Sequence, residues 1–141
     1  MSDRDYTFTI IKPDGIKRKL VGKINSILEE FGIVMSKASM TKLGLEEARK
    51  FYAEHQPRPF YNGLLSFMTS GPLLMLILKA RNATKRMRRL LGNTNPNQSK
   101  PGTIRFLFGS NTQHNVIHNS DSNSSAKKEL AFGASHFQLE F

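Results

Sequence analysis

The chain has 141 residues, no cysteine, no tryptophan, and a formal net charge of +10 from 21 Lys and Arg against 11 Asp and Glu. The length suits a single domain over residues 1–141, and the lack of cysteine excludes disulfides, thiolate catalysis and Cys-ligated zinc. Because no run of eighteen apolar residues occurs and the first residues are polar, we expect a cytoplasmic protein with neither a membrane span nor a secretory signal.

The first predicted element is a strand over residues 6–11, where β-branched and aromatic side chains alternate with others. It ends at Lys12-Pro13-Asp14-Gly15, whose proline and glycine predict a tight turn. A lysine at the end of a buried strand can offer its ammonium group to a phosphate, although a solvated edge lysine is about as common. Lys12 is therefore a candidate phosphate ligand.

Helix and strand signals then alternate. Apolar residues at helical spacing predict a helix over residues 20–31, followed by a less regular strand over residues 33–43. A helix over residues 45–54 and a short helix over residues 63–68 come next. Between these two helices, Phe60 follows a proline, so its ring is a candidate platform for a nucleobase. Such aromatic residues more often complete a hydrophobic core.

The second half of the chain begins with a buried strand. Residues 73–78 form a continuous apolar run, which is typical of a central strand covered on both faces. A basic helix is predicted over residues 83–91. Residues 93–115 then read as a long loop rich in Asn, Pro, Gly and Ser, and loops of this length are usually functional or disordered. Its two prolines and Gly102 favour an ordered loop.

A short strand over residues 116–117 leads into His118 and a polar turn. Asp121 or Ser122 is expected to cap a helix over residues 123–131, and the tail beyond it shows little pattern. The order of elements is thus β-α-β-α-α-β-α-loop-β-α, which contains the two β-α-β units of a ferredoxin-like sandwich. We predict an α/β (α+β) fold with a four-stranded antiparallel sheet, helices on one face, and a long loop before the strand of the site.

His118 is the strongest catalytic candidate among the residue types. An imidazole acts as nucleophile, acid or base near neutral pH when a second group fixes which ring nitrogen is free, and Glu129 is the nearest carboxylate on the following helix. A lone histidine is nevertheless more often structural. A zinc site at His114 and His118 lacks the HExxH pattern, and Ser120, His118 and Asp121 are too close in sequence for a hydrolase triad.

The positive charge predicts attraction to polyanions or to ligands that carry phosphate. Much of it lies at residues 17–19 and at six basic residues between Lys79 and Arg89. Any single one of these side chains is more often simply solvated. Nucleic acid is only a secondary expectation, because tryptophan and an RNP-like aromatic strand are absent from the sequence.

A series of short motifs runs through almost the whole chain. They are Thr7-Phe8-Thr9-Ile10-Ile11-Lys12-Pro13-Asp14-Gly15, Phe51-Tyr52-Ala53-Glu54-His55, Arg58-Pro59-Phe60-Tyr61, Ser70-Gly71-Pro72, Leu91-Gly92-Asn93-Thr94-Asn95-Pro96, Pro101-Gly102-Thr103-Ile104-Arg105 and Asn115-Val116-Ile117-His118-Asn119-Ser120-Asp121-Ser122. In this order, the motifs resemble those of the nucleoside diphosphate kinase family. The agreement of so many motifs is highly specific.

The resemblance implies transfer of the terminal phosphoryl group of a nucleoside triphosphate, typically ATP, to a nucleoside diphosphate. The transfer would take two half-reactions through phosphorylated His118, with Glu129 orienting the ring and Ser120 in the same hydrogen-bonding neighbourhood. Asp121 and Glu54 would lie close to the cofactor Mg²⁺ and the histidine. The residues implied to hold the phosphates, the sugar and the base are Lys12, Tyr52, Phe60, Arg88, Thr94, Arg105 and Asn115.

The resemblance also implies a homo-oligomer, since the family usually forms hexamers and sometimes tetramers. Two departures from the family pattern bear on rate, assembly and stability. The family commonly continues with Gly-Asp-Phe where this chain has Phe106-Leu107-Phe108, and a glycine usually follows the histidine where this chain has Asn119. A side chain there is expected to crowd the phosphohistidine or to require another backbone angle. The alternative function is a catalytically weakened family member that binds nucleic acid through its basic surface.

Overall fold

The computed structural model describes residues 3–137, which contain a four-stranded sheet in the order β2-β3-β1-β4. All three strand pairs are antiparallel, so the predicted fold class is confirmed. β4 is the shortest strand and lies at one edge, paired with β1. The strands are β1 (Tyr6–Ile11), β2 (Val34–Thr41), β3 (Leu73–Lys79) and β4 (Ile117–Asn119).

Seven α-helices and four short 3-10 turns connect the strands within the described residues. The helices are α1 (Pro13–Lys17), α2 (Val21–Glu30), α3 (Leu45–Phe51), α4 (Tyr61–Met68), α5 (Ala83–Leu91), α6 (Ile104–Phe108) and α7 (Asn123–Gly133). The 3-10 turns are η1 (Asp3–Asp5), η2 (Ala53–His55), η3 (Pro96–Gln98) and η4 (Ala134–His136). Between residues 3 and 137, no helix has both the length and the hydropathy that crossing a bilayer requires.

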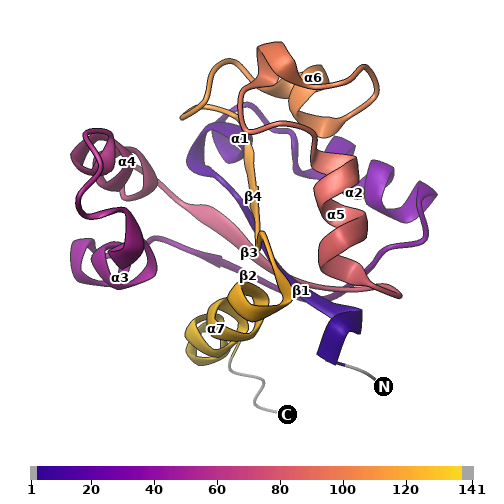
Figure 1. Ribbon diagram of the computed structural model, residues 1–141, viewed down its shortest axis with the longest axis horizontal. Helices are drawn as coiled ribbons and strands as arrows, with labels where there is room; N and C mark the ends of the chain where they lie inside the picture. Colours follow the sequence, from indigo (N-terminus) through magenta and orange to yellow (C-terminus); the bar gives the residue numbers. More distant parts are fainter. Residues whose placement is uncertain (1–2, 138–141) are drawn as a thin grey trace.

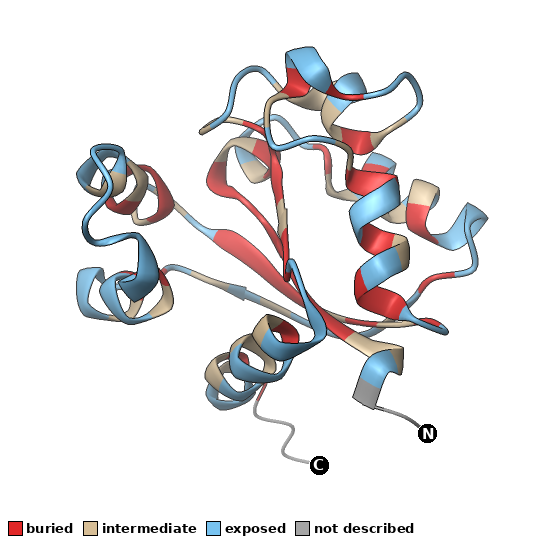
Figure 2. Ribbon diagram, in the orientation of Figure 1, coloured by how far each residue is buried: buried red, intermediate tan, exposed pale blue. Residues whose placement is uncertain are grey.

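The helices cover both faces of the sheet, whereas the order of elements predicted one face. Figure 1 shows α2 and α5 on one side of the strands and α3, α4 and α7 on the other. Successive residues of a strand point to opposite faces, and β1 is buried at five of its six positions (Figure 2). Each face of the sheet therefore needs its own cover, and the expectation of helices on one face was wrong.

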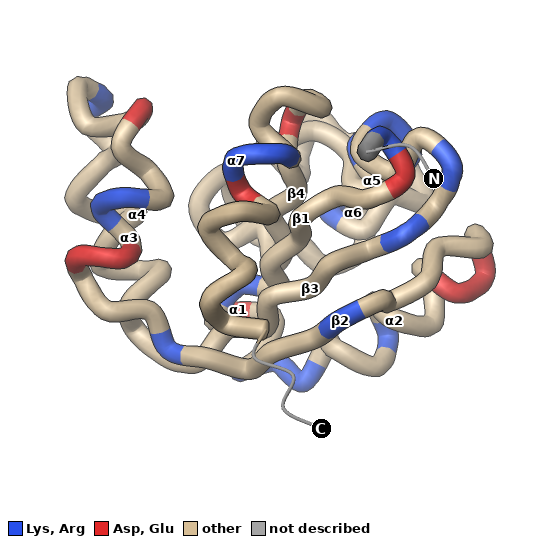
Figure 3. The backbone as a smooth tube through the Cα atoms, turned by 90° about the horizontal axis from the view of Figure 1, so that it is seen from below, with Lys and Arg blue, Asp and Glu red and all other residues tan. Residues whose placement is uncertain are grey.

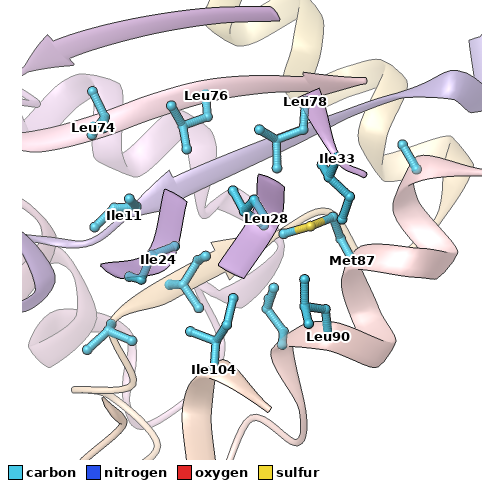
Figure 4. Close-up of a cluster of buried hydrophobic side chains, with 14 of the residues drawn as sticks. Ile11, Ile24, Leu28, Ile33, Leu74, Leu76, Leu78, Met87, Leu90 and Ile104 are labelled. Atoms are coloured by element: carbon cyan, nitrogen blue, oxygen red, sulfur yellow. The ribbon is translucent and has the colours of Figure 1, made fainter. Parts of the chain in front are cut away.

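Two apolar clusters result from this arrangement. In the first, Ile11 and Leu76 of the sheet pack against Leu28 of α2 and Met87 of α5 (Figure 4). In the second, Phe8 and Ile10 pack against α3, α4 and the C-terminal segment. Burial of such side chains contributes roughly 1.5–3 kcal/mol each. β1 contributes to both clusters, so the residue that follows it, Lys12, is anchored by a strand that is packed on both faces.

The turn predicted after β1 is instead the short helix α1. Pro13 occupies its first position, where the fixed φ of proline suits a helix and the missing N–H is not needed, and Lys12 precedes it as the N-cap residue. The predicted helix over residues 45–54 also ends early, at Phe51, and continues as η2. Proline and glycine alone do not distinguish a tight turn from a one-turn helix.

The long segment between α5 and β4 is ordered, as its prolines favoured, and holds more structure than a loop. It contains η3 and α6, and Thr103 caps α6 by accepting a hydrogen bond from Phe106 N at 3.3 Å. The predicted helix after His118 is α7. Ser122, not Asp121, is its N-cap, because the Ser122 hydroxyl accepts from Ser125 N at 3.0 Å. The final part of the predicted tail, residues 138–141, lies outside the described residues.

Candidate active site

The chain encloses a cavity of about 760 Å³ beside β4, bounded by α3, α5, α7 and the segment that precedes β4. Such a volume suits a small molecule of nucleotide size. All the predicted site residues line it except Ser120, which lies behind Glu129. Those that line it are Lys12, Tyr52, Glu54, Phe60, Arg88, Thr94, Arg105, Asn115, His118, Asp121 and Glu129.

His118 is held by a carboxylate on α7. Its Nε2 lies 2.6 Å from Glu129 Oε1, and the Phe51 ring packs edge-on against the imidazole with 5.3 Å between centroids. Because a carboxylate only accepts hydrogen bonds, Nε2 carries the proton of this bond, and in the neutral imidazole Nδ1 then keeps its lone pair. The Ser120 hydroxyl donates to the same Glu129 oxygen at 3.1 Å. The predicted orientation of the ring by Glu129 thus has a matching geometry.

The backbone before His118 is strained. Val116 has φ of 69°, a left-handed conformation that is rare for a β-branched residue. Two contacts with the first helical turn hold it there: Val116 N donates to Asp14 Oδ2 at 3.1 Å, and Lys12 N donates to Val116 O at 2.8 Å. A Cβ on Gly15 would lie 2.8 Å from Ile11 Cγ2 and 3.2 Å from Val116 O, so a side chain there would have to displace both neighbours. The strain lies two residues before His118.

Lys12 is buried at the bottom of the cavity and donates to Asn115 Oδ1 at 2.8 Å. Burial, and then the nearby Arg105 guanidinium, lower the pKa of Lys12 to about 8. Asn115 is fixed in turn, because its Nδ2 donates to Thr94 O at 2.8 Å and to Thr112 O at 2.9 Å. The ammonium group is thus held by Asn115, whose own amide is fixed by two backbone carbonyls.

Two arginines add positive charge above Lys12. Arg105 donates to Gly92 O at 3.1 Å and to Ile117 O at 2.8 Å, and its buried Nε has no partner. Burial, and then Arg88, lower the pKa of Arg105 to about 10. Arg88 itself donates to Asp121 O at 3.0 Å. Like charges packed this closely repel one another, so the site is built to be neutralised by an anion.

Tyr52 brings a further unused polar group to the cavity. Its hydroxyl is buried and has no hydrogen-bond partner, although buried polar groups are nearly always paired. Burial, and then the Glu129 carboxylate, raise the pKa of this phenol. Tyr52 is therefore a neutral donor that a bound anion would satisfy.

Acidic groups flank the basic ones. The Asp121 carboxylate accepts from Ser125 Oγ at 2.7 Å, and this bond, together with Arg88 and Ser122, lowers the pKa of Asp121. Glu54 is exposed at the rim, 3.8 Å from Lys128 Nζ. Among the described residues there is no group of three or more His, Cys, Asp or Glu able to hold a metal ion by themselves.

Phe60 lies at the mouth of the cavity and is 45% exposed. Its ring centroid is 5.4 Å from that of His55. An aromatic face that stays accessible to solvent can accept another ring, whereas a residue that completes a core cannot. The position agrees with the predicted base platform rather than with the core alternative.

Sequence reasoning missed several residues of the site. The sequence predicted a turn at Asp14, yet this residue holds the strained Val116. No role in the site was predicted for Phe51, yet its ring packs on the imidazole. Ser125 had no predicted role, and it orients Asp121. These contacts join residues that no local sequence pattern connects. The one available signal of an unusual backbone conformation was the preference of Gly and Asn near turns for the left-handed region.

Of the two departures from the family pattern, Asn119 forms part of the cavity wall, whereas residues 106–108 do not line the cavity. Asn119 lies in β4 with an ordinary strand backbone, and its side chain is buried against Thr7 and Thr9 of β1. The expected crowding of the histidine by Asn119 is thus not found. Phe106 and Leu107 are half exposed on the outside of α6.

Comparison with known proteins decides the family. The family model described as nucleoside diphosphate kinase matches residues 5–138. The chain belongs to the nucleoside diphosphate kinase family. It is 43% identical to a nucleoside diphosphate kinase of Bdellovibrio bacteriovorus over 127 residues, 90% of both chains. It is 45% identical to that of Rickettsia canadensis over 127 residues, 90% of this chain and 91% of the relative.

Solved structures of nucleoside diphosphate kinases have the same fold. The Aquifex aeolicus enzyme matches with a TM-score of 0.87 and 35% identity, covering 91% of this chain and 93% of that one. The Halobacterium salinarum enzyme, in complex with CDP, matches with a TM-score of 0.89 and 36% identity, covering 96% of this chain and 92% of that one. Because its relatives are nucleoside diphosphate kinases, this member of the nucleoside diphosphate kinase family is a phosphotransferase. The nucleic-acid-binding alternative receives no support from these relatives.

Proposed function

We propose that this chain transfers the γ-phosphoryl group of a nucleoside triphosphate, typically ATP, to a nucleoside diphosphate through phosphorylated His118. The single observation that carries the proposal is the His118–Glu129 hydrogen bond of 2.6 Å at the wall of a cationic cavity. It leaves Nδ1 unprotonated and free to attack phosphorus. All of the machinery lies within the single domain proposed for residues 1–141.

In the first half-reaction, the Nδ1 lone pair attacks the γ-phosphorus. The P–N bond forms as the bond between phosphorus and the bridging oxygen of the β-phosphate breaks, and the nucleoside diphosphate leaves with the electron pair. The proton on Nε2 stays in its bond to Glu129, whose charge stabilises the cationic phosphorylated ring. In the second half-reaction, a terminal oxygen of another nucleoside diphosphate attacks phosphorus, the P–N bond breaks, and neutral His118 is restored.

Lys12, Arg88 and Arg105 hold the phosphates in this proposal. Phosphoryl transfer is catalysed mainly by positioning and by neutralising charge, and these groups are fixed before the ligand arrives. A bound polyphosphate would also give the buried Tyr52 hydroxyl a partner. The remaining polar ligands of the phosphates and the sugar are Thr94 and Asn115.

Phe60 supplies the base platform. Stacking on a ring reads no hydrogen-bonding edge of the base, so purine and pyrimidine nucleotides are both expected to be substrates. The Halobacterium relative was solved with CDP, a pyrimidine nucleotide, in a structure similar to this one. Broad use of nucleotides follows from this kind of contact.

Mg²⁺ is the proposed cofactor. The ionised Asp121 carboxylate in the cavity fits a metal that binds through one or two carboxylates together with substrate phosphates. Asp121 would lie near the ion and act on it indirectly, with Glu54 at the rim of the same site. When bound, the ion neutralises charge that develops on the phosphate oxygens.

We also propose a homo-oligomer, a hexamer or a tetramer, in the cytoplasm. Support for assembly comes from the edge strand β2, which exposes apolar side chains at Val34 and Met40. The cytoplasmic location stays a prediction from the cysteine-free composition. The location of the tagged protein in intact cells tests it.

The decisive experiment incubates the purified chain with γ-labelled ATP and Mg²⁺, and then adds GDP or CDP. An acid-labile, base-stable label that passes to the added diphosphate is expected. His118→Ala should abolish it, and His136→Ala is the matched control, since His136 pairs with Glu47 outside the cavity. An unlabelled wild-type protein would overturn the proposed function, and a label that survives His118→Ala would overturn the assignment of the nucleophile.

A further inference from the structure

The side chain of Asn119 lies on the opposite face of β4 from His118. In an antiparallel sheet successive side chains alternate, and Asn119 stands opposite Thr9 of β1. His118 faces α7 and α3 through Glu129 and Phe51. Asn119 faces the other side of the sheet, where Figure 1 shows α5 packed beside the strands.

The Asn119 amide is fully used in a buried network. Its Oδ1 accepts from Thr9 Oγ1 at 2.6 Å, while its Nδ2 donates to Thr7 Oγ1 at 3.2 Å and to Ser120 O at 2.8 Å. Thr84 Oγ1 of α5 donates to the same Thr7 oxygen at 2.8 Å. Three of these side chains are at most 1% exposed, and Asn119 is 7% exposed. Buried polar networks of this kind, with every member paired, fix one arrangement of the elements that they join.

The network ties α5 to β4 close to the reacting groups. Thr84 lies one helical turn before Arg88, so both project from the same side of α5. Arg88 donates to Asp121 O, and Asp121 follows Asn119 by two residues. Helix α5 is thus fastened at two successive turns to the segment that carries His118. Any shift of α5 along β4 would change the distance between Arg88 and the imidazole.

We propose that Asn119 is a positioning residue for phosphoryl transfer, whose buried amide sets the placement of α5 against β4 and so aims Arg88 and His118 at the same phosphate. This inference rests on the proposed transfer through His118. The glycine that usually stands here in the family has no side chain and cannot form this connection. The positioning role therefore requires an asparagine at position 119 together with the threonines at positions 7, 9 and 84.

The test is single-turnover labelling by γ-labelled ATP in Asn119→Ala. The amplitude of labelling counts the molecules with a competent site, and the rate constant at saturating ATP reports how well that site is aligned. We expect the rate constant to fall roughly tenfold with the amplitude kept, because small misplacements of catalytic groups are costly. Asn25→Ala, at a partly exposed position of α2 that bonds only within its own helix to Glu29, is the matched control and should retain the wild-type rate.

Thr84→Val keeps the test decisive if Asn119→Ala does not fold. It removes one hydroxyl from the α5 end of the network, keeps the shape of the side chain, and should slow labelling roughly threefold. In the double variant the two effects should be less than additive, since both act through Thr7. A lost amplitude with an unchanged rate constant, or a wild-type rate in a folded Thr84→Val, would overturn the inference. Failure of the wild-type protein to label overturns the proposed function instead.

Discussion

The bond between His118 and Glu129 determines, at the scale of single residues, which ring nitrogen can react. In Glu129→Gln the volume is kept, but the negative charge that holds the Nε2 proton is lost. Hydrogen bonds to charged groups contribute about 1.5–3 kcal/mol, so the rate of phosphorylation should fall roughly ten- to a hundredfold. Labelling at saturating ATP measures this change.

Glu47→Gln is the matched control for that experiment. Glu47 Oε2 lies 2.9 Å from His136 Nε2, so the chain contains a second carboxylate–histidine pair outside the cavity. Its loss should leave the rate within a factor of about two, since neither Glu47 nor His136 lines the cavity. Equal losses in both variants would mean that Glu129 acts on stability and not on the ring.

The buried Lys12 ammonium predicts a specific pH dependence of nucleotide binding. Its pKa is lowered to about 8, first by burial and then by Arg105, from 10.5. Below about pH 8 the free protein offers a cation to the phosphates, and above it the amine is neutral. Affinity for ADP should therefore decline as pH rises through about 8, and in Lys12→Met this decline should disappear.

The lowered pKa of Lys12 also makes the free energy of unfolding depend on pH. This dependence runs opposite to that of ADP affinity, because stability rises with pH where the affinity falls. The charged form is disfavoured in the folded state, so the cost of burying it is fully present below pH 8. It is relieved between about pH 8 and 10.5, where the unfolded chain still binds the proton. The difference in unfolding free energy between wild type and Lys12→Met should change across this window and be flat below it. A flat difference throughout would place the pKa of Lys12 near 10.5.

Residue types and motif order predicted which side chains meet in the cavity, because strand ends and helix faces fix where Lys12, Arg88 and His118 can point. They did not predict the supporting contacts. Asp14 holding Val116 spans 102 positions in the chain, and the Asn119 network joins β1, β4 and α5. Such contacts depend on the packing of whole elements, which no local pattern encodes.

At the scale of elements, the end of α5 determines where Arg105 can lie. Gly92 ends this helix with φ of 86°, and its carbonyl accepts from Arg105. A Cβ on Gly92 would lie 2.5 Å from Thr103 Oγ1, so Gly92→Ala combines an unfavourable φ with a clash. We expect a loss of roughly 2–4 kcal/mol in unfolding free energy, measured by urea denaturation, and weaker nucleotide binding.

Gly102→Ala separates the two causes. Gly102 has φ of 89°, almost the value at Gly92, but a Cβ there would meet no atom within 4 Å. It should lose only roughly 1–2 kcal/mol and leave nucleotide binding unchanged. If both variants lose the same stability, the contact with Thr103 is not what requires glycine at position 92.

The strands were the easier elements to predict. β1 and β3 are marked by apolar and β-branched runs, and they pair antiparallel from Tyr6 opposite Lys79 to Ile11 opposite Leu74. The one-turn helices α1 and α6 were not predicted, because they are shorter than the period on which a helical signal depends. The continuous apolar run of β3 already indicated cover on both faces of the sheet, whereas the order of elements alone predicted helices on one face.

At the scale of the whole molecule, the +10 charge is distributed over the fold. Lys and Arg lie along many separate elements, β2 and α7 among them, rather than in one stripe (Figure 3). Nucleic-acid surfaces typically gather their basic residues on one face. The concentrated positive field is instead in the cavity, where Lys12, Arg88 and Arg105 converge.

The exposed edge of β2 predicts how the molecule assembles. β2 pairs with β3 alone among the described strands, and apolar side chains along and beside it are about half exposed: Phe31 at 55%, Val34 at 57%, Met40 at 55% and Leu45 at 46%. An unpaired strand with apolar neighbours readily accepts another strand, and a second copy of the chain offers the same edge for a symmetric contact. We expect a native mass that is a multiple of the chain mass by sedimentation equilibrium.

A charge placed on this edge should weaken that contact. Val34→Lys and Met40→Lys each put an ammonium group into an apolar interface, where an unpaired charge is costly, so the mass should shift toward smaller species at low protein concentration. Ser124→Lys adds the same charge at an exposed position of α7 and is expected to leave the mass unchanged. If all three variants keep the wild-type mass, assembly does not use β2. A wild-type monomer at high concentration would instead mean that the exposed edge serves no contact between copies, and the cavity would then have to work within a single chain.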